Sequence, residues 1–222
     1  ACDTVGEVAA AASLGSLKGA RGNSGVILSQ IFRGFARALD GKDEMDAAML
    51  AVALKTGTEA AYKAVMKPAE GTVLTVSRLA GDRAGRAAEE NTAFEYVLGS
   101  ALERAREALA DTVNQNPVLK KAGVVDAGGK GYLVILDGML RALRGEEIPD
   151  VSEEKAESKA DFSALSEEEI TFTYCTEFIA SRKDKARNVA RLRSILNEIG
   201  DSLVVVEDDD IVKVHVHTDQ PN

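Results

Sequence analysis

Three glycine-containing turns stand directly before helical segments in the first two thirds of the chain. The first reads Lys-Gly-Ala-Arg-Gly-Asn-Ser-Gly over residues 18–25, and an amphipathic segment follows at once. Glycine lets a backbone approach a ligand closely, and a helix that begins there leaves unpaired N–H groups at the positive end of its dipole. With the polar groups of Asn23 and Ser24, this chemistry suits phosphate binding. The alternative is a glycine turn in which Asn23 or Ser24 serves only as the helix N-cap.

The second and third turns repeat the same composition. The second, Lys-Pro-Ala-Glu-Gly-Thr over residues 67–72, offers Gly71 for close approach and Thr72 to cap a helix or bond a phosphate oxygen. The third, residues 122–131, places the charge of Asp126 beside several glycines. Three such turns in one helical domain predict that helix N-termini converge on one ligand.

A cysteine and two histidines form a separate candidate site. His215 and His217 are two residues apart on a predicted strand, so both imidazoles project from one face. Residues 170–174 alternate as a second strand, and the alternation that buries Tyr174 places Cys175 on the opposite face. One thiolate and two imidazoles suit tetrahedral zinc with water or a fourth ligand. The alternative is a polar sheet face with unrelated residues.

The elements before residue 145 follow a helical period. Thr4 with Glu7 and Thr92 with Glu95 have the spacing of capping boxes. Apolar residues recur at intervals of three and four in the segments between the turns, and no strand pattern occurs there. Six or so helices with short loops predict an all-α domain.

The period changes in the last quarter of the chain. Residues 170–174, 203–206 and 211–216 are predicted as strands, and residues 184–200 as a helix. We therefore expect three parts: a helical nucleotide-binding domain over residues 1–145, an acidic linker over residues 146–169, and a small α+β domain over residues 170–222. Both domains are expected to be incomplete.

Composition narrows the classes of function. The chain has 222 residues and a net charge of −9, which argues against nucleic acid as a partner. The stretch 146–169 holds ten acidic residues against two lysines, which is typical of an exposed connector. No apolar run is long enough for a transmembrane helix. Cys2 and Cys175 do not indicate a disulfide framework, so a reducing cytoplasm is the expected location.

At the three turns, and at the later Cys-Thr-Glu-Phe and His-Val-His-Thr-Asp segments, the chain resembles the bacterial fatty acid kinase family. The first domain of that family is similar to the nucleotide-binding subunit of dihydroxyacetone kinase. The resemblance implies a barrel of antiparallel helices that holds ATP or ADP and magnesium at one end. It also implies phosphorylation of a fatty acid carboxylate, with the fatty acid carried by a separate binding protein as partner. A homodimer is left open.

The resemblance also implies roles for individual residues. The positions expected to bind the nucleotide are Gly22, Asn23, Ser24, Gly25, Gly71, Thr72, Asp126, Ala127, Gly128 and Gly129. The first turn would contact the phosphates, the second would line the pocket, and the third would lie beside the nucleotide. The resemblance carries Cys175, His215 and His217 together as well, which supports the zinc hypothesis.

One departure from the family limits these expectations. The family holds magnesium with an Asp-Gly-Asp-Thr-Gly motif upstream of the first turn, and Asp3-Thr4 does not replace it. No catalytic residue is therefore assigned. The chain is expected to be an internal fragment that does not catalyse the reaction. Two other hypotheses stay open: a kinase of small polyols such as dihydroxyacetone, and a non-catalytic nucleotide-binding module.

Overall fold

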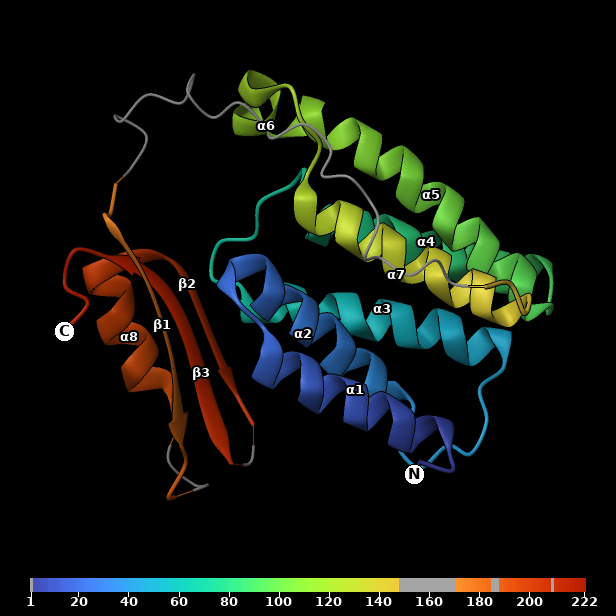
Figure 1. The fold of residues 1–222 in the computed structure, drawn as a ribbon, viewed down its shortest axis with the longest axis horizontal. Coiled ribbons are helices and arrows are strands. Elements are labelled where there is room, and N and C mark those ends of the chain that lie inside the picture. Colours follow the sequence, from blue (N-terminus) through green and yellow to red (C-terminus); the bar gives the residue numbers. More distant parts are fainter. Residues whose placement is uncertain (1, 148–170, 185–187, 209) are drawn as a thin grey trace.

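The computed structural model describes residues 2–147, 171–184, 188–208 and 210–222. In these ranges a helical domain precedes a smaller domain of three strands and one helix (Figure 1). The helices of the first domain are α1 (Val5–Gly19), α2 (Gly22–Ala38), α3 (Ala47–Ala64), α4 (Val73–Glu90), α5 (Phe94–Gln115), α6 (Pro117–Ala122) and α7 (Ala127–Leu143). The second domain contains β1 (Tyr174–Ser181), α8 (Ala190–Ile199), β2 (Gly200–Glu207) and β3 (Ile211–Thr218). The predicted all-α domain followed by a small α+β domain is confirmed.

Small residues let the helices of the first domain pack closely. At Gly34 on α2, a Cβ atom would lie only 2.4 Å from the carbonyl oxygen of Thr56 on α3. At Gly57 on α3, a Cβ atom would lie 2.6 Å from the carbonyl oxygen of Ile31 on α2. Apolar side chains of α2 to α5 and α7 fill one continuous core around this contact. The core therefore holds the starts of α2, α4 and α7 on a fixed frame.

Helix capping confirms the first predicted box in part and contradicts the second. The hydroxyl of Thr4 accepts the backbone N–H of Glu7, as the first box predicts, but the Glu7 carboxylate accepts the N–H of Asp3 and not that of Thr4. The box of Thr92 and Glu95 does not form, because α5 begins one residue later than its spacing requires. The N-cap of α5 is Ala93, which has no side-chain hydrogen bond, and Asn91 accepts the Ala93 N–H instead.

The three strands form an antiparallel sheet in the order β1-β3-β2. The predicted strand at residues 170–174 is wrong, because β1 begins at Tyr174, opposite Thr218 at the end of β3. Residues 171–173 have no β3 partner, and Ile170 lies outside the described residues. Tyr174 is also not a core residue, since 53% of it is exposed. Pairing with β3, not local alternation, sets where β1 begins.

The helix of the second domain is shorter than the predicted range of residues 184–200. It begins at Ala190, because the side chain of Asn188 accepts the Ala190 N–H in a local turn before it. Residues 185–187 lie outside the described residues. The helix packs against the face of β3 that carries Val212, Val214 and Val216, which confirms the predicted core face of this strand.

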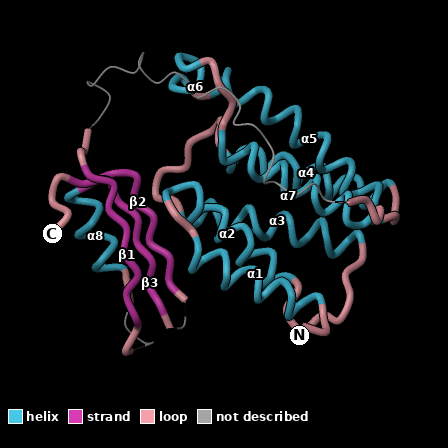
Figure 2. The backbone as a smooth tube through the Cα atoms, viewed as in Figure 1, coloured by secondary structure: helices cyan, strands magenta, loops and turns pink. Residues whose placement is uncertain are grey.

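The opposite face of the sheet packs against the helical domain. Figures 1 and 2 show the sheet between α8 on one side and α1 and α2 on the other. Leu17, Ala20 and Val26 form an apolar cluster there with Val204 and Val206 of β2. Both faces of β2 and β3 are therefore covered, at the end of the helical domain where α2 begins, whereas the residues of the edge strand β1 are exposed or half-buried.

Two further predictions concern the acidic linker and transmembrane helices. Of the predicted linker, only Glu146 and Glu147 lie in the described part, and the rest falls outside it. Among the described residues, none of the helices is both long enough and apolar enough to cross a membrane.

Candidate functional site

The first turn leaves the start of α2 without a side-chain cap. The N-cap residue is Arg21, which makes no side-chain capping hydrogen bond, so Asn23 and Ser24 are not the caps that the alternative hypothesis required. Gly22 has a φ of 65°, a left-handed conformation that favours glycine. Ser24 is exposed, whereas Oδ1 of Asn23 is buried and has no hydrogen-bond partner among the described residues. The turn therefore offers free N–H groups and an unused side-chain acceptor.

The second turn is more tightly built. Gly71 has a φ of 74°, and a Cβ atom there would lie 3.0 Å from Asn116, so the position suits glycine on both counts. The hydroxyl of Thr72 accepts the N–H of Leu74 at 3.3 Å and donates to the carbonyl of Ala69 at 2.8 Å. Thr72 is thus the N-cap of α4, as one of its two proposed roles predicted.

Glu70 organises this turn, and the sequence reasoning gave it no role. Its carboxylate accepts hydrogen bonds from Tyr62 on α3 at 3.0 Å and from Thr75 and Arg78 on α4, both at 2.8 Å. The hydroxyl of Thr75 also accepts the Gly71 N–H at 2.8 Å. The signal was present in the sequence, because an acidic residue next to the turn glycine can receive donors from both flanking helices.

The third turn places Asp126 at the start of α7. Its carboxylate accepts the Gly129 N–H at 2.6 Å, which makes it the N-cap. Its own N–H donates to the Thr112 hydroxyl on α5 at 3.1 Å. Burial raises the pKa of Asp126, and hydrogen bonds from the N–H groups of Gly129 and Val73 oppose that rise. Asp126, whose charge the sequence did not explain, therefore has a structural role as the N-cap of α7.

The structure brings the three turns together. A Cβ atom on Gly128 would lie 3.4 Å from Cβ and Oγ of Ser24, so the first and third turns touch. A Cβ atom on Gly129 would lie 2.9 Å from Cγ2 of Val76 in the first turn of α4, so the starts of α4 and α7 touch as well, and the Val73 N–H is close enough to lower the pKa of Asp126. Figure 1 shows the starts of α2, α4 and α7 at the end of the helical domain nearer the sheet. Three helix N-termini that meet create a positive potential suited to an anion.

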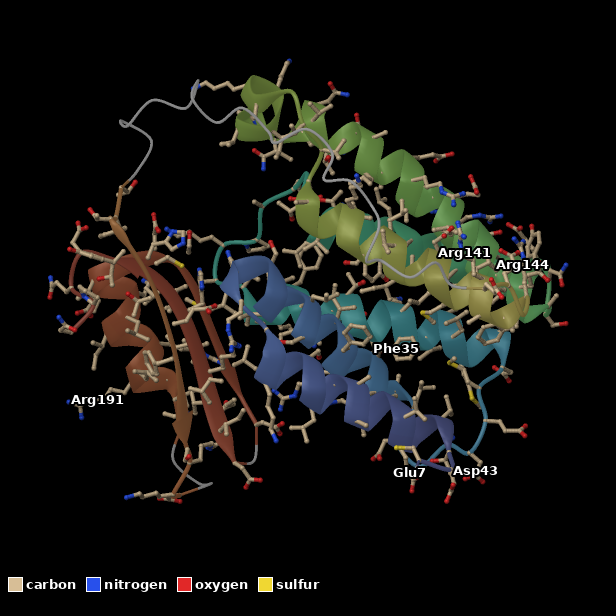
Figure 3. All side chains as sticks on the ribbon, viewed as in Figure 1. Glu7, Phe35, Asp43, Arg141, Arg144 and Arg191 are labelled. Carbon is tan, nitrogen blue, oxygen red and sulfur yellow. The ribbon has the colours of Figure 1, made fainter. Side chains whose placement is uncertain are left out.

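A hollow of about 640 Å³ lies elsewhere and has a different character. It is lined mainly by charged side chains of α5 and its neighbours. Arg144 pairs with Glu95 there at 2.7 Å, and both side chains are about half exposed. Arg141 and Arg144 mark this end of the domain in Figure 3, away from the sheet. It is an exposed ion-pair surface, and the three turns take no part in it.

The structure also brings the predicted zinc ligands together. Cys175 lies opposite His217 in the β1–β3 ladder, so their side chains share a face with His215. One ligand atom from each of the three residues lies within 4.8 Å of the others. Within the described ranges, this is the one group of three or more histidine, cysteine or acidic side chains with such spacing. The sequence predicted this face correctly although it placed the β1 strand too early.

Two carboxylates stand beside the imidazoles. Nδ1 of His215 lies 3.1 Å from Glu177, its cross-strand neighbour, and 4.0 Å from Sγ of Cys175. Nδ1 of His217 lies 3.5 Å from Asp201 on β2. Burial lowers the pKa of His215, and the hydrogen bond with Glu177 opposes that effect. Carboxylates in this position are common around metal-binding histidines, because they orient the ring. Glu177 was missed, although it follows Cys175 by two residues and so shares its face.

Comparison with known families now adds to this geometry. Residues 1–141 match the DAK2 domain, and residues 171–222 match the FakA-like middle domain of fatty acid kinases. The chain belongs to the DAK2 domain family, whose members are kinase-related. More particularly, the two matches in this order identify a fatty acid kinase-like DAK2 protein, as the resemblance of the turns predicted.

Curated relatives extend beyond this chain. An uncharacterized protein of Staphylococcus saprophyticus is 44% identical over 225 residues, covering 98% of this chain. Protein YloV of Bacillus subtilis is 42% identical over 229 residues, covering 99% of this chain. The chain spans 41% of the length of each of these two relatives.

Proposed function

We propose that the helical domain binds ATP or ADP at the joined starts of α2, α4 and α7, as the nucleotide-binding part of a fatty acid kinase. The observation that carries this proposal is the contact among the starts of the three helices, with Gly128 against Ser24 and Gly129 against Val76. Phosphoryl transfer depends mainly on positioning and on neutralising charge, and convergent helix N-termini supply both. The unpartnered Oδ1 of Asn23 is a further group that a ligand would satisfy.

The proposal gives each turn a part. Residues 22–25 would contact the phosphates, with the N–H groups at the start of α2 as the main donors. Gly71 and Thr72 would line the pocket, and residues 126–129 would form the loop beside the nucleotide. The antiparallel barrel belongs to the same proposal: each helix from α1 to α5 packs against the next one, and α7 returns to contact α5, α4 and α2.

Magnesium does not fit the described residues of the helical domain. A magnesium site needs several oxygen ligands in near-octahedral geometry, and no group of three acidic or metal-binding side chains gathers among the described residues of this domain. The resemblance assigns that ion to an upstream aspartate motif that this sequence does not contain. The nucleotide proposal therefore rests on the three turns and names no magnesium ligand among the described residues.

Nucleotide binding can be tested on the chain itself. Ser24→Ala combined with Thr72→Ala should weaken ADP binding in isothermal titration calorimetry by about thirtyfold, since each of the two lost hydrogen bonds is worth roughly 1 kcal/mol. Ser100→Ala on α5, outside the three turns, is the matched control and should bind as the wild type does. An unchanged ADP affinity in the double variant, with the circular dichroism spectrum intact, would count decisively against the site.

The middle domain supports a fatty acid as the acceptor. A kinase of small polyols needs no such domain, whereas residues 171–222 match the FakA-like middle domain of fatty acid kinases. We infer that the complete protein phosphorylates the carboxylate of a fatty acid presented by a binding protein. A chain extended to the length of its relatives should form acyl phosphate with that partner present. If it phosphorylates dihydroxyacetone and ignores fatty acids, the polyol alternative is correct.

We also propose that Cys175, His215 and His217 hold zinc. The supporting observation is that their ligand atoms lie within 4.8 Å of one another on one sheet face, with Glu177 and Asp201 beside the rings. Zinc bound there would tie β1 to β3 and leave one position for water or another ligand.

A further inference from the structure

Lys213 on β3 is a buried cation that faces the helical domain. Only 1% of the residue is exposed, although lysine is rarely buried without a specific partner. Its Nζ donates to the carbonyl oxygens of Leu17 at 3.2 Å and Ala20 at 2.5 Å, both at the end of α1. The last carbonyls of a helix lack intrahelical partners and lie at the negative end of its dipole, so an ammonium group satisfies them well.

The Leu17 carbonyl lies directly before the first turn, and the Ala20 carbonyl lies within it. Ala20 is the C-cap of α1, Arg21 is the N-cap of α2, and Gly22 follows with its φ of 65°. A Cβ atom on Gly25 would lie 3.4 Å from Cα of Ala20, so the backbone of Ala20 supports the far side of the turn. Fixing the Ala20 carbonyl therefore fixes both sides of the loop over residues 20–25.

The second turn is also tied to the sheet. Val65, the C-cap of α3 just before that turn, forms a β-bridge with Val204 on β2. Arg33 on α2 donates to the backbone carbonyl of Glu207 at the end of β2. The sheet therefore contacts two of the three turns. Of these contacts, the hydrogen bonds of Lys213 lie closest to the loop over residues 20–25.

We propose that Lys213 is a positioning residue of the nucleotide site, which holds the loop over residues 20–25 in its binding conformation through the carbonyls of Leu17 and Ala20. The proposal rests on the proposed nucleotide function. According to this proposal, the α+β domain helps to hold the nucleotide site in shape, in addition to being joined to the helical domain. Lys213 touches no phosphate, because its ammonium group is engaged by the two carbonyls.

The test compares Lys213→Met, Lys213→Arg and Lys42→Met in the 222-residue chain. Methionine keeps the length of the side chain and removes its donors, arginine keeps the charge and the donors, and Lys42 is an exposed control between α2 and α3. Lys213→Met should weaken ADP binding on the order of tenfold, as expected when a hydrogen bond from a charged group is lost. Lys213→Arg should recover most of the affinity, and Lys42→Met should bind as the wild type does.

Hydrogen exchange without nucleotide supplies a second readout. In Lys213→Met the backbone amides of residues 18–20 should exchange several-fold faster, because the last turn of α1 loses the buried ammonium donor and keeps only the Arg21 guanidinium, while those of α4 and α5 keep their rates. If Lys213→Met does not fold, Lys213→Gln replaces it, since its amide NH2 keeps N–H donors on a shorter, uncharged side chain.

The outcomes separate the two proposals. If the wild-type chain binds no ADP, the nucleotide function itself is wrong, and the role of Lys213 in it falls too. If the wild type binds ADP and the folded Lys213 variant binds it equally well, only the positioning role is wrong. Weaker ADP binding with unchanged exchange at residues 18–20 would also overturn the positioning role.

Discussion

Ser24 on α2 lies directly against Gly128 on α7, at a distance where a Cβ atom on the glycine would be in van der Waals contact with the serine side chain. The two residues are more than a hundred positions apart in the sequence. Because Gly128 has no side chain, the backbone at the starts of α2 and α7 stays accessible where the two helix N-termini meet. A side chain larger than hydrogen at residue 128 would occupy that place.

Gly128→Val should therefore block the nucleotide site. A Cβ atom at this position would lie 3.2 Å from the carboxylate of Asp126 and 3.4 Å from Ser24, and the two methyl groups of valine would reach further into the turns. We expect ADP affinity to fall by at least about tenfold in calorimetry, a loss of roughly 1.4 kcal/mol. Gly138→Val on the same helix is the control, because a Cβ atom there meets nothing within 4 Å. Equal ADP affinities for the two variants would contradict the location of the site.

A second prediction concerns the pH dependence that Asp126 brings to stability. Burial raises its pKa above the ordinary value of 3.8, so folding favours the neutral carboxyl. The folded chain then binds more protons than the unfolded chain above that value, and stability falls as pH rises through this range. Asp126→Asn stays neutral at every pH and keeps an oxygen to accept the N–H groups. We expect the unfolding free energy of the wild type, relative to this variant, to decrease between about pH 4 and pH 7.

Urea denaturation at several pH values measures this difference. A difference that grows in favour of the wild type with pH would show that the two N–H donors and the helix dipole outweigh desolvation of the carboxylate. In that case folding would lower the pKa of Asp126, not raise it.

The contact between α2 and α3 makes a third prediction, about stability. Gly34→Ala would place a methyl group 2.4 Å from a backbone carbonyl of α3, so the helices must separate. Overpacking of this kind costs about 1–3 kcal/mol. Gly15→Ala on α1 meets nothing within 4 Å and should instead stabilise by about 0.5–1 kcal/mol, the usual gain of alanine over glycine in a helix. Thermal unfolding of both variants checks the opposite signs, and a Gly34→Ala variant as stable as the wild type would disprove the close contact.

The sequence could predict features with a local signal. The three turns were found because glycine, proline and aspartate mark turns by their own backbone preferences, and two of the proposed site residues, Thr72 and Asp126, do cap helices. The alternation of residues 211–216 placed His215 and His217 on one face of β3 and the valines on the other, as observed. That the turns converge was a hypothesis from their number, and only the structure gives the contact between Ser24 and Gly128.

Non-local packing explains what the sequence could not predict. The start of β1 depends on where β3 ends, so the alternation at residues 170–174 was misleading. The Thr92 box failed because α5 begins one residue later than its spacing requires. The face of β3 that carries the histidines looked like a polar surface, yet Lys213 and His215 are both buried there. Burial by a distant helix pair leaves no periodic signal in the strand itself.

The last prediction concerns zinc. The purified chain should carry close to one zinc ion, measured by inductively coupled plasma mass spectrometry, and Cys175→Ser should lose most of it. Zinc at about 2.0–2.3 Å from each ligand sets the ligand atoms about 3.3–3.8 Å apart, so the group within 4.8 Å must contract by only about 1 Å. Cys2→Ser is the matched control, because Cys2 is also a free, exposed cysteine but has no histidine partners. Since binding requires a thiolate and neutral imidazoles, zinc should leave as pH falls. If Cys175→Ser retains its zinc, or if both cysteine variants lose zinc equally, Cys175 is not a zinc ligand. The alternative, a polar sheet face with unrelated residues, would then be correct.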